Sequence, residues 1–151
     1  MSPAFVLRTD GGARGNPGPA GAGFVLEDPS GVTVRSGGRF LGEATNNVAE
    51  YEALVWGLRT ALDQGVRDIQ VRADSELVVK QVNGHYRVKN AGLAPLHAEA
   101  CALLSRFASA KVVHVRRAEN EAADALANEA MDLRGEIGDG VAAGDGRSRL
   151  F

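Results

Sequence analysis

The chain of 151 residues is 44% hydrophobic and 24% charged, a composition that indicates one globular domain and excludes a disordered chain. Its single cysteine, Cys101, excludes an internal disulfide framework and a cysteine zinc site. The lone cysteine, the lack of a secretory-signal pattern and the lack of a long apolar run together favour a cytoplasmic location. The net charge of −2, from 17 basic and 19 acidic residues, argues by itself against a nucleic-acid-binding protein.

The first part of the sequence predicts three strands. Residues 4–10 alternate in polarity and run into a glycine-rich turn. Residues 20–28 and 32–41 are two further candidate strands around Asp28-Pro29-Ser30-Gly31, whose residue types are typical of a tight turn. Strands joined so closely are expected to form an antiparallel meander.

The middle and the end of the sequence alternate between helical and strand patterns. Apolar residues recur at helical spacing over residues 47–64, Gly65 is a natural stop, and Asn47 with Glu50 resembles a capping box. The other predicted elements are strands at residues 68–73 and 111–116, and helices at residues 75–83, from Pro95 to about Ala108, and at residues 121–133 with Asn120 as cap. A meander followed by such units predicts an α/β domain with a mixed five-stranded sheet flanked by helices.

The glycines divide the chain into a domain and a tail. Five of the 19 glycines fall within residues 135–146, so we expect a domain over residues 1–134 and a glycine-rich tail over residues 135–151. The tail ends with two basic and two apolar residues that could dock: Arg147, Arg149, Leu150 and Phe151. Docking of the tail on the domain and docking on a neighbouring copy both remain open.

Four acidic residues stand at positions that suit a shared site. Asp10 and Asp74 end predicted strands, at the edge where α/β sheets bind ligands. Glu50 lies on a line of small residues in a first helical turn, which turns it toward the sheet, and Asp124 lies in the first turn of the last helix. Each acid alone is explained by turn or cap formation.

Taken together, the four acids predict a metal site. Converging carboxylates repel one another and stay ionised only when cations bind between them. Oxygen ligands without clustered cysteine or histidine favour magnesium or manganese. Two such ions, roughly 4 Å apart, support phosphodiester cleavage.

Four blocks of sequence follow one another in an order typical of one known family. They are Thr9-Asp10-Gly11-Gly12 with Gly15-Asn16-Pro17-Gly18-Pro19-Ala20-Gly21, then Ala44-Thr45-Asn46-Asn47-Val48-Ala49-Glu50-Tyr51, then Asp74-Ser75, and last Asn120-x-x-x-Asp124-x-Leu126-Ala127-Asn128. Over about residues 4–132 the chain thus resembles ribonuclease H of the type-one class.

The resemblance implies the ribonuclease H-like fold and a metal-dependent endonuclease. Such an enzyme hydrolyses the RNA strand of an RNA–DNA hybrid with two divalent ions and leaves 5′-phosphate products. By position, Asp10, Glu50, Asp74 and Asp124 match the catalytic metal ligands, with Mg²⁺ as the cofactor and Mn²⁺ as an alternative.

The resemblance also implies substrate contacts. It places Asn16, Asn46 and Asn47 in the minor groove of the hybrid and Thr45 at a phosphate of the DNA strand. Amides donate and accept hydrogen bonds, so they suit the 2′-hydroxyls and base edges that distinguish RNA from DNA. For Asn16 a role in the turn, and for Asn47 a role as a cap, remain open alternatives.

Two departures from the family pattern single out basic residues. The loop histidine of many members is absent, and Arg117 is a candidate fixed cation for the leaving phosphate, with a surface ion pair as the open alternative. The lysine-rich protrusion of some members is absent too. Residues 77–98 contain Lys80, Arg87 and Lys89 without any acid, which suggests either a reduced contact with the DNA backbone or a solvated loop.

Three hypotheses about function remain: a hybrid ribonuclease, a non-catalytic hybrid- or RNA-binding module, and the same fold acting on double-stranded RNA or DNA. None of the four acids is missing, which favours the first. We expect a monomer with no membrane partner. When the four proposed metal ligands are set aside from the 19 acids, 17 basic residues face 15 acidic ones, so net charge no longer excludes nucleic acid.

Overall fold

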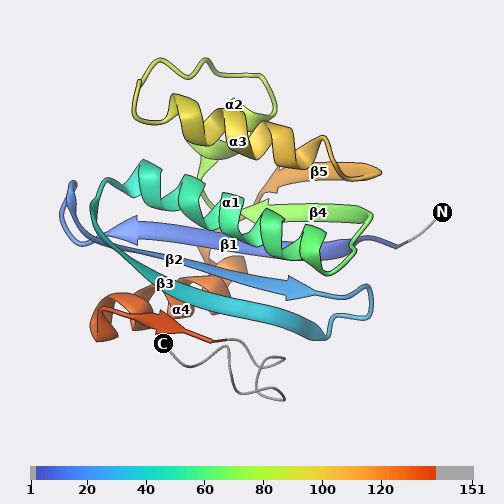
Figure 1. Ribbon diagram of the computed structural model, residues 1–151, viewed down its shortest axis with the longest axis horizontal. Helices are drawn as coiled ribbons and strands as arrows, with labels where there is room; N and C mark the ends of the chain where they lie inside the picture. Colours follow the sequence, from blue (N-terminus) through green and yellow to red (C-terminus); the bar gives the residue numbers. More distant parts are fainter. Residues whose placement is uncertain (1–2, 139–151) are drawn as a thin grey trace.

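Six strands form one mixed sheet in the computed structural model, which describes residues 3–138 (Figure 1). In sheet order they are β5 (Ser109–His114), β4 (Asp68–Ala73), β1 (Phe5–Ala13), β2 (Gly18–Glu27), β3 (Thr33–Ala44) and β6 (Glu136–Ile137). The first three strands form an antiparallel meander, β4 and β5 run parallel to β1, and β6 pairs antiparallel with β3. The mixed sheet confirms the predicted fold class.

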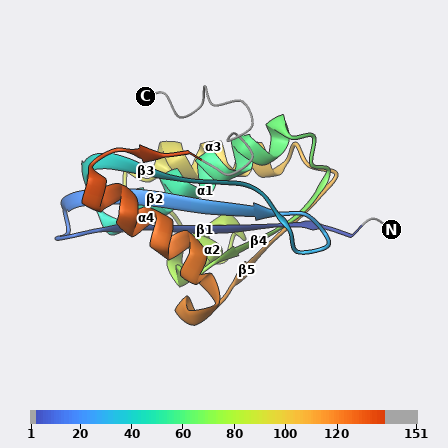
Figure 2. The same ribbon diagram turned by 90° about the horizontal axis from the view of Figure 1, so that it is seen from below.

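Helices lie on both faces of this sheet (Figures 1 and 2). They are α1 (Asn46–Asp63), α2 (Glu76–Val82), α3 (Ala94–Leu104) and α4 (Glu121–Leu133), with a 3₁₀ helix, η1 (Arg117–Asn120), leading into α4. One face is covered by α1, with α3 packed beside it, and α4 lies on the opposite face. No helix of the described residues is long and apolar enough to cross a membrane.

The core between the sheet and α1 follows from strand alternation. Leu7, Ile69 and Val71 project from β1 and β4 toward α1 and are almost wholly buried, together with Leu54 and Leu58 of the helix. Burying such a side chain stabilises the fold by about 1.5–3 kcal/mol. The core therefore fixes α1 against the two strands that carry the predicted acids.

Small residues let α4 approach the other face closely. A Cβ on Gly23 would collide with the Ala123 carbonyl oxygen of α4. The buried residues of α4, Ala123, Ala127 and Ala130, likewise have short side chains. The first turn of α4, with its acidic residue, is thereby held close to β2 and β1.

The observed elements differ from the predicted ones in a few places. The sheet has six strands in the described residues, not five, because β6 is only two residues long and carries no periodic signal. The helix expected to reach about Ala108 ends at Leu104, after which Phe107 folds back into the core. Residues 139–151, with the tail residues Arg147, Arg149, Leu150 and Phe151, lie outside the described residues.

Candidate active site

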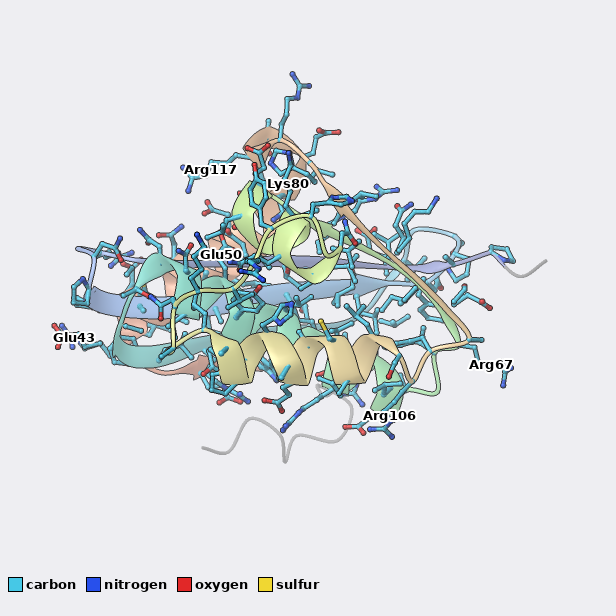
Figure 3. All side chains as sticks on the ribbon, turned by 90° about the horizontal axis from the view of Figure 1, so that it is seen from above. Glu43, Glu50, Arg67, Lys80, Arg106 and Arg117 are labelled. Carbon is cyan, nitrogen blue, oxygen red and sulfur yellow. The ribbon has the colours of Figure 1, made fainter. Side chains whose placement is uncertain are left out.

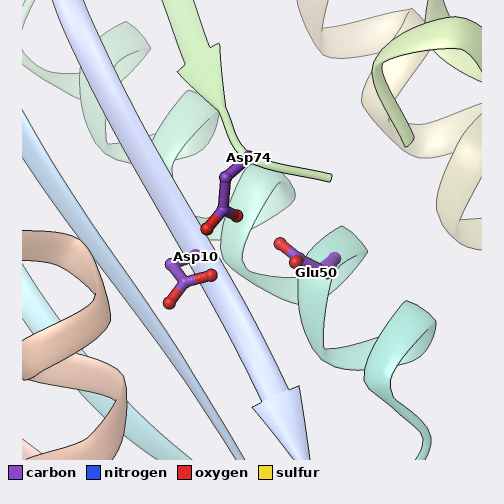
Figure 4. A group of neighbouring side chains, drawn as sticks. All are labelled: Asp10, Glu50 and Asp74. Carbon is purple, nitrogen blue, oxygen red and sulfur yellow. The ribbon is translucent and has the colours of Figure 1, made fainter. Parts of the chain in front are cut away.

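Three carboxylates from three elements converge at the carboxyl edge of the sheet (Figure 4). Single oxygen atoms of Asp10, Glu50 and Asp74 all lie within 4.8 Å of one another. The parallel register of β1 and β4 extends to the pair Thr9 and Ala73, so the next residue of each chain segment is one of these aspartates. This register places Asp10, which lies within β1 and not at its end as predicted, beside Asp74, which directly follows β4.

Glu50 reaches the aspartates because α1 touches β1. A Cβ on Gly11 would collide with the Ala49 carbonyl oxygen, so only glycine permits this approach. The Gly11 amide donates a hydrogen bond of 3.2 Å to the Glu50 carboxylate. Backbone contact and hydrogen bond together place Glu50 inside the cluster.

The predicted capping box of Asn47 and Glu50 is wrong. The helix begins one residue earlier, and the Thr45 hydroxyl caps it by accepting a hydrogen bond of 3.2 Å from the Val48 amide. Glu50 is then five residues beyond the cap, two positions past the place from which a glutamate reaches back. Its carboxylate is turned to Gly11 instead.

Asp124 approaches the cluster from the opposite side of the sheet. It lies in the first turn of α4 and lines one cleft together with Asp10, Glu50 and Arg117. Its side chain interacts with that of Asp10, and this contact is one cause of the raised pKa of Asp10. Asp10, Glu50 and Asp124 therefore line one cleft, and Asp74 joins the first two in the tight cluster.

Burial and mutual repulsion make the cluster hold protons in the absence of counter-charge. Burial, followed by the charge of Glu50, raises the pKa of Asp10 to about 10. Burial, followed by the charge of Asp74, raises the pKa of Glu50 to about 8, against the opposing effect of the Gly11 amide. A ligand set made only of carboxylates fits a hard divalent cation, which would supply the missing positive charge.

Arg117 stands beside the cluster. Its Nε atom lies 3.9 Å from the Asp74 carboxylate, and its side chain is 79% exposed. The alternative expected from the sequence, a surface pair with Glu119 or Glu121, is not the recorded contact, and Glu119 pairs with Arg116 instead. The guanidinium therefore faces the cleft while remaining accessible to solvent.

Two hydrogen bonds hold η1, and with it Arg117, on β1. The Arg8 guanidinium donates to the Glu119 carbonyl oxygen at 2.9 Å, and the side-chain amide of Asn120 donates to the Thr9 carbonyl oxygen at 2.7 Å. The predicted capping role of the Asn120 side chain is wrong, because that side chain turns into the sheet and makes no cap bond. It is fully buried, and within residues 3–138 its Oδ1 atom has no hydrogen-bond partner.

The predicted minor-groove residues form a connected rim on one side of the cleft. The Asn46 amide donates to the Asn16 side-chain oxygen at 3.0 Å, and the Ala13 amide donates to the Asn46 side-chain oxygen at 2.7 Å. These bonds tie the turn between β1 and β2 to the start of α1. Thr45 and Asn47 flank Asn46 in the chain, so all four residues lie at this junction.

The predicted basic segment, residues 77–98, covers most of α2, the connection to α3 and the start of α3. Lys80 pairs with Glu76 at 3.4 Å and lies 5.1 Å from the centre of the Tyr86 ring, whereas Arg87 and Lys89 are exposed. In Figure 3, Lys80 lies toward the same end of the molecule as Glu50 and Arg117, away from Arg67 and Arg106.

A buried glutamine of α2 links this segment to α1. Gln81 donates to the Arg87 carbonyl oxygen at 3.3 Å and accepts a hydrogen bond of 2.7 Å from the hydroxyl of Tyr51, the neighbour of Glu50 in α1. Nothing in the sequence pattern marked Gln81, since a glutamine on a short helix is ordinarily exposed.

Comparison with known proteins gives the family. A family model described as "Reverse transcriptase-like" matches residues 8–130. The protein named Ribonuclease HI from Halobacterium salinarum is 49% identical over 123 residues, which cover 82% of this chain and 62% of that protein. The protein named Ribonuclease H from Sulfurovum sp. is 33% identical over 143 residues, which cover 88% of this chain and 95% of that protein.

A solved structure agrees with these relatives. The crystal structure of LC11-RNase H1 in complex with an RNA/DNA hybrid matches with a TM-score of 0.82 and 41% identity, over 86% of this chain and 98% of that chain. The chain spans less than two thirds of the length of the Halobacterium relative and 35% of the length of mycobacterial relatives that it matches.

Proposed function

The chain belongs to the ribonuclease H family, and we propose that it hydrolyses the RNA strand of RNA–DNA hybrids. The observation that carries this proposal is the convergence of Asp10, Glu50 and Asp74 within 4.8 Å, with Asp124 in the same cleft. The relative LC11-RNase H1 has been crystallised with an RNA/DNA hybrid, which supports the same substrate here.

We assign the four carboxylates to the binding of two divalent cations, Mg²⁺ or alternatively Mn²⁺. When bound, such ions activate a water molecule and stabilise the leaving oxygen of a phosphodiester. The chain contributes the rigid placement of the ligands: the parallel register of β1 and β4 holds Asp10 beside Asp74, and the Gly11 amide orients Glu50. The raised pKa values of Asp10 and Glu50 support this assignment, because both carboxyls need positive charge to ionise.

Arg117 is proposed as the cation that meets the phosphate at the scissile bond. Within residues 3–138, the contact of its exposed guanidinium with Asp74 is a long one of 3.9 Å, which leaves the group room to turn toward a bound phosphate. A fixed positive charge there stabilises the charge that develops on the phosphate oxygens. The hydrogen bonds from Arg8 and Asn120 that hold η1 limit how far Arg117 moves.

Recognition of the hybrid is proposed on two surfaces. Asn16, Asn46 and Asn47 at the rim suit the 2′-hydroxyls and base edges of the minor groove, and Thr45 suits a DNA phosphate. The second surface is the basic segment of α2 and the connection that follows it, where the positive charges of Lys80, Arg87 and Lys89 suit the DNA backbone. Because double-stranded RNA also presents 2′-hydroxyls, it is the second candidate substrate. We further propose a monomer acting in the cytoplasm.

The proposal is tested by cleavage of an end-labelled hybrid across a titration of Mg²⁺ and of Mn²⁺, with Asp10→Asn as the inactive control. We expect internal cleavage of the RNA strand only, and weaker or no cleavage of competing double-stranded RNA and DNA. Hybrid binding without cleavage under either metal would support the non-catalytic binding module in its place.

A further inference from the structure

The cleft that contains the carboxylates continues along the chain to a second polar group, Arg14. The same cleft is lined by Asp10, Gly12, Arg14 and, from α4, Asn128. Side chains alternate along β1, so Asp10 and Gly12 face the side on which α4 lies, and Arg14 directly follows the strand. Contacts of Arg14 with α4 agree with this placement.

The Arg14 side chain is oriented by α4 and is still open to solvent. Its Nη2 atom lies 2.8 Å from the Asp132 carboxylate and donates at 3.3 Å to both the carbonyl and the side-chain oxygen of Asn128. Its backbone amide donates to the Pro19 carbonyl oxygen at 2.8 Å, which fixes the turn. Since the described residues offer its Nε and Nη1 atoms no recorded partner, these donors remain for a ligand.

Between Asp10 and Arg14 the cleft is lined by Gly12, and packing does not require a glycine at this position. A Cβ on Gly12 would meet only the Asn46 side-chain oxygen, at an ordinary contact distance of 3.8 Å. This differs from Gly11, where a Cβ would collide with α1. The fold therefore tolerates a side chain at Gly12, and its absence leaves an open path from the carboxylates to Arg14.

We propose that Arg14, oriented by Asn128, binds a phosphate of the same strand that is cleaved, beyond the scissile bond. This inference rests on the proposed function. Four residues of strand cover about 13 Å, and a nucleic-acid strand rises about 3.4 Å per nucleotide along the helix axis, so the contacted phosphate lies a few nucleotides away. The guanidinium fork suits two oxygens of one phosphate.

The first experiment compares hybrid binding by Arg14→Ala, Asp132→Asn and Arg59→Ala, using fluorescence anisotropy without divalent cations so that no cleavage occurs. Arg59 is the matched control, because it too is an exposed arginine paired with an acid, Glu99. We expect Arg14→Ala to bind roughly tenfold more weakly and to lower the salt slope of binding by about one. The other two variants are expected to keep the slope of the parent.

Two results would overturn the subsite. One is an Arg14→Ala variant with the affinity and salt slope of the parent. The other is an equal loss in Asp132→Asn, since that would mean that the ion pair acts through the fold and not through a phosphate. Failure of the proposed function is seen separately, as a parent protein that neither binds nor cleaves the hybrid.

A second experiment identifies the strand. Single neutral methylphosphonate linkages are placed along either strand of the hybrid, and binding by the parent and by Arg14→Ala is compared. We expect one position in the RNA strand where the neutral linkage weakens binding by the parent but not by the variant. A sensitive position found only in the DNA strand would overturn the proposal, as would no sensitive position in either strand.

Discussion

The Gly11 amide donates a hydrogen bond of 3.2 Å to the Glu50 carboxylate, at the point where β1 and α1 touch. The neighbouring Gly12 also lines the cleft, but a Cβ there would collide with no backbone atom. Two adjacent glycines thus differ in what they do: Gly11 permits the helix to approach, whereas Gly12 leaves room for a ligand.

This difference predicts opposite behaviour for two similar substitutions. Gly11→Ala is expected to lower the free energy of unfolding by about 1–3 kcal/mol, because the new methyl group collides with backbone. Gly12→Ala is expected to keep the thermal stability of the parent and to lower hybrid cleavage. Thermal unfolding and cleavage assays on both variants check this, and a parent-like activity in a stable Gly12→Ala protein would contradict it.

The buried acids predict a stability that depends on pH and metal. In the metal-free protein the pKa of Asp10 is raised from 3.8 to about 10, so unfolded chains release a proton that folded chains keep. The contribution of Asp10 to the free energy of unfolding is therefore greatest below pH 3.8, and it falls as the pH rises toward about 10. Asp10→Asn removes this loss and is expected to raise the free energy of unfolding at pH 8 by roughly 1–3 kcal/mol, and by less at pH 5.

Denaturant unfolding at the two pH values measures this effect, with Asp63→Asn as the control for removing an exposed carboxylate at the end of α1. Adding Mg²⁺ is expected to stabilise the parent protein, because a ligand of the folded state shifts the equilibrium. Asp10→Asn should gain less from the metal. An equal gain in both proteins would place the bound cation elsewhere.

Asn120 was predicted as a helix cap, and its actual contacts lead to a different prediction. Asn120→Ala removes the buried hydrogen bond to the Thr9 carbonyl oxygen, at a cost of about 0.5–1.5 kcal/mol. Because the bond also holds η1, turnover is expected to fall more than stability alone explains. Asn83→Ala is the matched control, since Asn83 also donates to a strand carbonyl, Val112, away from the cluster. Equal turnover in the two variants would reduce Asn120 to a structural role.

The sequence was sufficient to predict the acid cluster because each acid belongs to, or directly follows, an element with a clear periodic pattern. Asp74 directly follows the alternating strand β4, Asp10 lies within the longer strand β1, and the helical period places Glu50 inward. Asn120 was misassigned, since an asparagine before a helix ordinarily caps it and only the packing of η1 on β1 turns it away. β6 was missed because its two residues gain their pairing entirely from the tertiary fold.

Arg117 and Arg116 offer a direct test of the proposed phosphate contact. Both arginines are exposed and adjacent, but Arg117 lies beside Asp74, whereas Arg116 pairs with Glu119 at 3.7 Å. Arg117→Ala is expected to lower kcat by on the order of 10²-fold with little change in KM, because a charge that acts on the transition state contributes little to substrate binding. Arg117→Lys should recover part of the rate, since it keeps the charge without the fork. Arg116→Ala should retain the kcat of the parent. If Arg116→Ala lost as much kcat as Arg117→Ala, η1 would contribute only its net positive charge and not a guanidinium placed at the phosphate.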